Sequence, residues 1–305
     1  MNSILSALNY IASDDRQVWL EIGMAIKSDL GDEGFAIWDR WSQSANSYSE
    51  KTSRIVWKSI KYGGRITIAT LYKRAIEGGW KDDGKMPSPA QEEARKQRVE
   101  REAQVAEAET KRRHAAAAHY AESMLKTAVA DSHQYLVEKG FAAEKLPVLP
   151  DGRLFIPMRD MLNNRIIGAQ FIRLVDNAWD KKFLTGQRSS GAVYRLGRAP
   201  DAILCEGVAT GLTILAAVRQ MQVNLAVVVC FSAGNIVKVA RNLPGRNCCL
   251  ADNDKSTTGE RAAIATGLPW GMPDQVGEDC NDLHQRAGLM PVCLLVQKVI
   301  ARIAA

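Results

Sequence analysis

Residues 201–254 read DAILCEGVATGLTILAAVRQMQVNLAVVVCFSAGNIVKVARNLPGRNCCLADND, and this stretch decides the fold of the second half of the chain. Three short runs within it, 202–205, 225–231 and 247–251, are rich in Val, Ile, Leu and Cys. Such runs are typical of parallel strands that are covered on both faces. A helix is predicted over 210–219, between the first two runs. The stretch therefore predicts an α/β unit with a mostly parallel sheet.

Acidic residues follow two of these runs. Glu206 comes directly after the first run, and Asp252 and Asp254 follow the third. Open α/β sheets bind ligands at the carboxyl ends of their strands. Three carboxylates gathered there would repel one another strongly without a divalent cation, and oxygen ligands suit Mg²⁺ or Mn²⁺. We therefore expect a Mg²⁺ or Mn²⁺ site at this edge, with Asp279 or Asp282 completing a second metal site.

The Asp-Asn-Asp triplet at 252–254 has a second interpretation. Taken alone, it is more typical of a solvated turn, because Asp and Asn are common turn residues. Its position after a buried strand, together with Glu206 after another strand, favours the metal site.

Composition limits the classes of protein. The chain has 305 residues, 46% of them apolar, which is enough for about two globular domains. Its net charge of +6 suits a polyanionic partner. No run of about 18 apolar residues predicts a membrane span, and the first residues do not resemble an export signal. The six cysteines form no CxxC pair, so we expect no zinc and no disulfide framework, and reduced thiols in a cytoplasm.

Composition also changes along the chain, which suggests four segments. Residues 1–80 hold five of the seven tryptophans and show helical spacing, so we expect a small all-helical domain. Its tryptophans are expected to fill the core rather than to stack on bases, because a module of this size needs large side chains. Residues 81–130 are expected to form a polar linker and a long charged helix. Residues 131–200 read as a basic segment that contains a short helix, capped by Ser132, and a β-hairpin. Residues 201–305 read as the α/β unit with C-terminal helices.

Basic side chains recur immediately before the acidic strand ends. Some must be outward-facing positions of half-buried strands, but their density fits a groove for a phosphate backbone. The basic residues of this segment include Arg153, Arg159, Arg165, Arg173, Lys181, Lys182, Arg188 and Arg195.

The N-terminal segment resembles a known family. Its stretches VWLEIGMAIK, FAIWDRWSQ and ITIATLYKRAIEGGW are similar to the second-type primase C-terminal module (PriCT-type) of phage and plasmid primases. The resemblance covers most of residues 5–80. It implies no catalytic residues, because the module has none that are accepted.

Residues 131–290 resemble a second family. EGVATG followed by ADND is similar to a Toprim domain, the metal-binding fold of bacterial-type primases, topoisomerases and some nucleases. GRLFIPMRD, RIIGAQFIR, KKFLTG and GAVYRLG resemble, in this order, the subdomain that precedes Toprim in the DnaG-like primase core. FSAGN, at 231–235, resembles the corresponding segment of phage-type Toprim primases. The resemblance implies that Arg153, Arg173 and Lys182 contact nucleotide or template.

Three features depart from the family pattern. No cysteine pair is available for the zinc-binding domain of bacterial primases, Thr210 stands where those primases often have another acid, and no GxxxxGK[ST] helicase motif follows. We therefore expect a replicative helicase as a separate partner, or else a truncated or dedicated primase.

Together these observations predict a DNA primase, a Mg²⁺-dependent nucleotidyltransferase that makes short RNA primers from NTPs on a single-stranded DNA template. It would act in phage or plasmid replication, in the cytoplasm of a bacterial host. Asp252 and Asp254 are the expected metal ligands, and Glu206 is a third ligand or a general base. Lys181 and Arg195 join the expected nucleotide- or template-binding residues. The alternatives are a Toprim-type nuclease that uses the same acids, and a non-catalytic DNA-binding replication accessory protein.

Overall fold

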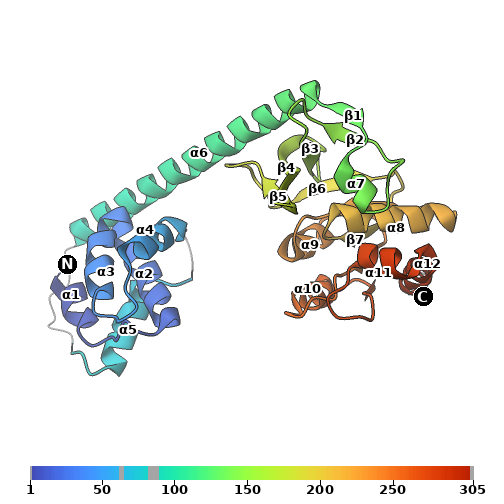
Figure 1. Cartoon of the computed structure of the whole chain (residues 1–305). Coiled ribbons are helices and arrows are strands. Elements are labelled where there is room, and N and C mark those ends of the chain that lie inside the picture. Colours follow the sequence, from blue (N-terminus) through green and yellow to red (C-terminus); the bar gives the residue numbers. More distant parts are fainter. Residues whose placement is uncertain (1, 62–64, 82–88, 303–305) are drawn as a thin grey trace. The chain divides into compact units, whose positions relative to one another are not determined.

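The computed structural model describes residues 2–61, 65–81 and 89–302 (Figure 1). The chain forms two compact units, residues 1–110 and 111–305. Most of the polar linker predicted between the helical domain and the long helix, at 82–88, lies outside the described residues. In the described part of the chain, no helix is both long and apolar enough to cross a membrane.

The first unit is helical in its described residues, as predicted. Its second helix begins at the N-cap Asp15, whose side chain accepts a hydrogen bond from the Val18 N–H at 2.8 Å. Its last short helix follows Thr67. The helices of this unit are α1 (Asn2–Leu8), α2 (Arg16–Leu30), the 3₁₀ helix η1 (Gly31–Gly34), α3 (Phe35–Ser42), α4 (Glu50–Ser59) and α5 (Ile68–Glu77).

Tryptophans fill the core of this unit, which confirms the prediction for them. Trp38 is fully buried and lies 4.4 Å from Trp19 and 5.4 Å from Trp57, measured between ring centroids. Each indole N–H has an acceptor; that of Trp38, for example, donates to the Trp19 carbonyl at 3.0 Å. A Cβ on Gly23 would lie 2.9 Å from the Trp38 ring, so the ring requires glycine there.

The long charged helix is α6 (Pro89–Thr127), close to its predicted limits. Its part after residue 110 belongs to the second unit. There Ala121 is fully buried and packs with Phe155 and Phe171 of the sheet. The end of α6 therefore covers one face of the β-rich part of that unit.

The second unit is built on one ten-stranded mixed sheet. Its strands follow the order β1-β2-β3-β6-β8-β7-β9-β10, and β4 and β5 extend from β3. Strands β7 to β10 are parallel, and β6 joins them to β3 through antiparallel pairing. The strands are β1 (Val129–Asp131), β2 (Leu146–Val148), β3 (Leu154–Asp160), β4 (Ile166–Val175), β5 (Ala178–Phe183), β6 (Ala192–Leu196), β7 (Ala202–Cys205), β8 (Ala226–Val229), β9 (Asn247–Leu250) and β10 (Trp270–Gly271).

The predicted hairpin is formed by β3 and β4, which pair antiparallel. Asn164 occupies its turn with φ of 59°, a conformation that Asn tolerates better than most residues. The short helix before the hairpin is α7 (Gln134–Glu138). The prediction that Ser132 caps α7 is wrong: the N-cap is His133, because its extended backbone lets ring Nδ1 accept from the Tyr135 N–H at 3.1 Å.

Helices cover both faces of the parallel strands (Figure 1). Residues of α8 (Val208–Gln220), α11 (Cys280–Ala287) and α12 (Leu289–Ile300) pack into the core on one face, and α9 (Ala233–Ala240) and α10 (Thr258–Thr266) cover the other. Both faces of the strands are therefore buried, which is why the strands read as continuous apolar runs. All six cysteines are free and buried.

A buried amide joins β6 to the start of α9. The Asn235 side chain donates to the carbonyls of Ala192 and Cys230, each at 2.8 Å, and accepts from the Gly191 N–H at 2.8 Å. Three backbone groups thus depend on one side chain, and these groups lie beside the carboxyl end of β8.

We predict that Asn235→Ala lowers the free energy of unfolding of the second unit by roughly 2–4 kcal/mol, because three buried polar groups lose their partner. Hydrogen–deuterium exchange of the β6 and β8 amides checks this. Asn242→Ala is the matched control, since Asn242 makes one exposed hydrogen bond, to the Lys238 carbonyl. Equal exchange rates in both variants would contradict the prediction.

Candidate active site

The predicted acids gather at one edge of the parallel sheet. Glu206 follows β7 and Asp252 follows β9 by two residues, and these strands are direct parallel neighbours, with Leu204 opposite Cys249. The sequence-based expectation that the strand ends bring these carboxylates together therefore holds. We call Glu206, Asp252, Asp254, Asp279 and Asp282 the acidic edge.

Glu206 is held between two strands. Its carbonyl accepts from the Phe231 N–H at 2.9 Å, so the chain after β8 is tied to the chain after β7. Burial and the nearby charge of Asp254 raise the pKa of the Glu206 carboxyl, while the Ala233 N–H and Lys181 act to lower it. Glu206 is consequently a stronger proton acceptor than an ordinary carboxylate.

Asp252 is the least compensated acid of the edge. Its Oδ1 is buried and has no hydrogen-bond partner. Burial, followed by the charges of Asp279, Glu206, Asp254 and Asp282, raises the pKa of Asp252 to about 7. A buried acceptor without a donor is costly, so this oxygen is suited to a cation that approaches from solvent.

Asp254 has the opposite environment. Its carboxylate accepts hydrogen bonds from the Ser256 hydroxyl, from the Thr258 N–H at 3.2 Å and from the Gly259 N–H at 2.8 Å. These bonds, that of Ser256 foremost, lower the pKa of Asp254 to about 2. Asp254 is therefore ionised at neutral pH and fixed at the start of α10.

Gly259 and Asn253 also shape this loop. A Cβ on Gly259 would lie 2.4 Å from the Asp252 carbonyl oxygen, so only glycine lets α10 approach the Asp-Asn-Asp segment. Asn253 turns away from the acids, and its Nδ2 donates to the carbonyls of Pro273 at 2.9 Å and Asp274 at 3.3 Å. In the sequence, the signal for this close approach is Gly259, seven residues after Asp252.

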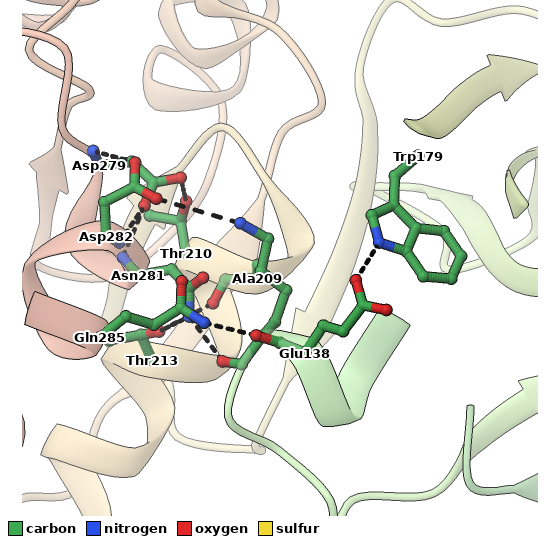
Figure 2. A network of polar contacts seen from close by, with 10 residues as sticks. Glu138, Trp179, Ala209, Thr210, Thr213, Asp279, Asn281, Asp282 and Gln285 are labelled. Atoms are coloured by element: carbon green, nitrogen blue, oxygen red, sulfur yellow. Dashed lines mark hydrogen bonds and ion pairs between the residues drawn. The ribbon is translucent and has the colours of Figure 1, made fainter. Parts of the chain in front are cut away.

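Asp279 and Asp282 cap the N-terminus of α11 (Figure 2). Asp279 Oδ1 accepts from the N–H groups of Asn281 and Asp282, while the Asp282 side chain accepts from the Asp279 N–H, which completes a capping box. Asp279 Oδ2 accepts from the Thr210 hydroxyl at 2.9 Å. The Thr210 hydroxyl therefore orients the Asp279 carboxylate. Metal binding by these two acids stays a prediction.

Two of the predicted basic residues, Lys181 and Lys182, lie on opposite faces of the β4–β5 hairpin. Directly opposed residues of an antiparallel pair point to the same face. Lys181 lies opposite Ile172, on the face that packs toward α8, whereas Lys182 lies opposite Phe171, on the face that α6 covers. Of these two lysines, it is Lys181 whose charge lowers the pKa of Glu206.

Arg153, Arg173 and Lys182 already have acidic neighbours. Arg173 and Lys182 each lie 3.4 Å from Asp180, and Arg153 pairs with Asp151 at 2.7 Å. Arg153 and Arg173 line a cleft of about 730 Å³, together with His133, Trp179 and others. Each of these three basic residues therefore has a carboxylate beside it, which lowers the local positive charge that a phosphate would meet.

Arg195 lies elsewhere. It lies on β6, opposite Val228 of β8, and its guanidinium donates to the Ala199 carbonyl. Burial lowers the pKa of Arg195. The structure thus gives it a packing role on β6, and its contact with nucleotide or template stays a prediction.

The donor chemistry of the acidic edge fits a divalent cation. Across residues 2–61, 65–81 and 89–302, no three His, Cys, Asp or Glu side chains are grouped closely enough to hold a metal ion by themselves. Mg²⁺, however, commonly binds through one or two carboxylates together with water and substrate phosphate. The unpartnered Asp252 oxygen, flanked by other carboxylates, offers such a partial ligand set.

The raised pKa of Asp252 predicts a pH-dependent cost in stability. In the folded chain Asp252 keeps its proton up to about pH 7, whereas the unfolded chain releases it near pH 4. The stability that this proton contributes is therefore full at low pH and is lost as pH rises toward 7. In EDTA, Asp252→Asn should raise the free energy of unfolding by roughly 2–4 kcal/mol at pH 8, and by less at pH 5.

Thermal unfolding of the wild type and the variant at both pH values measures this difference. Asp176→Asn is the control, because Asp176 is exposed in the β4–β5 turn at φ of 50°, which Asn also adopts. A stability gain for Asp252→Asn that is the same at pH 5 and pH 8 would show that Asp252 does not carry this charge.

Comparisons with known proteins relate one part of the chain to primases. Residues 1–75 match the family described as Primase C terminal 2 (PriCT-2), as the sequence of the N-terminal unit predicted. No curated protein matches the chain. A solved structure described as the DnaG catalytic core matches with a TM-score of 0.33 and 18% identity, over 50% of this chain and 51% of that chain. The match thus spans about half of that structure. The function of the α/β unit is therefore inferred from its own residues.

Proposed function

We propose that this chain is a Toprim-type DNA primase that joins ribonucleotides on single-stranded DNA in a Mg²⁺-dependent reaction. The observation that carries the proposal is the unpartnered, buried carboxylate oxygen of Asp252, which lies among other acids at the carboxyl ends of neighbouring parallel strands. The family match of residues 1–75 supports a role in priming rather than in another reaction of the same acids.

Asp252 and Asp254 are the residues that would hold Mg²⁺, with Glu206 as a third ligand or as the general base described below. Asp252 offers the unpartnered Oδ1, and Asp254, two residues later, supplies a carboxylate that hydrogen bonds fix at the start of α10. When bound, Mg²⁺ lowers the pKa of a 3′-hydroxyl and neutralises charge on the triphosphate. Asp254 is ionised throughout the neutral range and supplies a permanent negative charge.

Glu206 would move the proton. A general base works best when its pKa lies near the operating pH, and burial beside Asp254 shifts Glu206 in that direction. The carboxylate would take the 3′-hydroxyl proton while the Ala233 N–H holds it in place. Lys181, whose charge reaches Glu206, would bind a triphosphate or template phosphate.

A Toprim-type nuclease would use the same acids and remains the second candidate. A non-catalytic accessory protein would not need Asp252 to stay unpartnered. We also propose a replicative helicase as a partner and a bacterial cytoplasm as the location.

Incubation of the protein with single-stranded DNA, labelled NTPs and Mg²⁺ separates these functions. We expect labelled oligoribonucleotides, and a reduction of at least 100-fold for Asp252→Asn and Glu206→Gln. Asp176→Asn, remote from the acids in sequence and exposed, is the control for a charge-neutralising change. Cleaved template would indicate a nuclease, and no product from the wild type would refute both enzymes.

Metal binding has a readout that does not depend on turnover. Mg²⁺ should raise the Tm of the wild type at pH 8, because a ligand that binds only the folded chain stabilises it. The rise should be small for Asp252→Asn. Equal rises in both proteins would remove Asp252 from the metal site.

A further inference from the structure

Strand β5 lies at an edge of the sheet. In the described part of the chain it pairs only with β4, so its outer side is free of strand partners. Side chains alternate between the two faces of a strand. Trp179, Lys181 and Phe183 therefore share one face, and Asp180 and Lys182 share the other. We call the first three residues the β5 strip.

Each member of the β5 strip lies against an aromatic ring. Trp179 packs edge-on against Tyr135, with ring centroids 5.3 Å apart, and its indole N–H donates to Glu138 at 2.6 Å (Figure 2). The Lys181 ammonium lies 5.4 Å from the centre of the same tyrosine ring. Phe183 contacts Phe231 edge-on at 6.2 Å. All three side chains of the strip are thus packed against either Tyr135 or Phe231.

Phe183 is linked to the acidic edge through one residue, Phe231. It touches Phe231, whose N–H donates to the Glu206 carbonyl at 2.9 Å. Phe231 itself has φ of 67°, a left-handed conformation that is a genuine outlier for a bulky residue. The strained backbone therefore belongs to the residue that donates to the Glu206 carbonyl and whose ring contacts Phe183.

The Phe183 side chain nevertheless remains 42% exposed. The Phe231 ring supports it and is 91% buried, so Phe183 presents the accessible aromatic surface of the pair. An exposed aromatic ring that is fixed by a second ring, with a lysine two residues before it, combines a stacking surface with a phosphate contact. This is the combination used by proteins that bind single-stranded nucleic acid.

We propose that the β5 strip binds a single-stranded nucleic acid, with one base stacked on Phe183 beside the acidic edge and a backbone phosphate on Lys181. Trp179, about 13 Å further along the strand, lines the 730 Å³ cleft and marks the direction in which the strand leaves. The inference rests on the proposed function in that it takes a polynucleotide as the substrate of the acids.

The test compares a base-bearing strand with a base-free one. Fluorescein-labelled (dT)12 and an abasic strand of the same length are titrated with the full chain, in EDTA and without NTPs. We expect Phe183→Leu to weaken (dT)12 binding about 5- to 100-fold, as is usual for loss of one stacked base, and to leave the abasic strand unchanged. Lys181→Ala should weaken both strands alike.

Leu162→Ala is the control for loss of an exposed apolar side chain, because Leu162 is 73% exposed in the β3–β4 turn. Equal losses on both strands for Phe183→Leu, or none on either, would overturn the assignment of the ring to a base. Since no catalysis is measured, binding that depends on Phe183 without any primer synthesis would refute the proposed function alone.

Discussion

The crowding of negative charge at one sheet edge is the constraint on which the second unit depends. Two like charges 4 Å apart cost about 4 kcal/mol at a surface-like dielectric, and the acidic edge holds five carboxylates. The fold offsets this cost with the N–H groups at the starts of three helices: Ala233 of α9 serves Glu206, Gly259 of α10 serves Asp254, and Asp282 of α11 serves Asp279. Asp252 Oδ1 alone receives no donor. The repulsion is therefore offset by N–H donors at Glu206, Asp254 and Asp279, whereas Asp252 Oδ1 has none.

Much of this arrangement was predictable from the sequence. Strands β7 and β9 are buried on both faces, so their apolar runs end within about one residue of the structural limits, and the acids after them must meet at one edge. The roles of Asp279 and Asp282 were not predictable, because an acid that caps a helix and an acid that binds a metal occupy the same kind of position in a sequence. The prediction of the N-cap of α7 failed for a related reason. The side chains of Ser132 and His133 can both accept a hydrogen bond from a helix N–H, and backbone angles decide between them.

A polar network ties α11 to the β-rich part of the unit (Figure 2). Asn281, fully buried, donates to the Lys139 carbonyl at 2.9 Å and to the Thr213 hydroxyl at 3.1 Å, and Gln285 donates to the Glu138 carbonyl. Glu138 in turn accepts from Trp179 of the β5 strip. Hydrogen bonds have strict geometry. The helix that Asp279 caps and the strand that carries Phe183 are therefore held in register by the same few side chains.

Strand alternation separates charges that composition counts together. Lys181 and Lys182 are adjacent and equally basic, yet Lys182 shares a face with Asp180 and lies 3.4 Å from its carboxylate, while Lys181 faces the acids. A one-residue change in register would exchange these roles, which is why the density of basic residues could not identify the binding face. Since Asp151 and Asp180 neutralise several of the predicted cations, a strand at this edge would gain little from charge alone. Stacking on an exposed ring then becomes the larger contribution, because it does not depend on the cations that the fold has already paired.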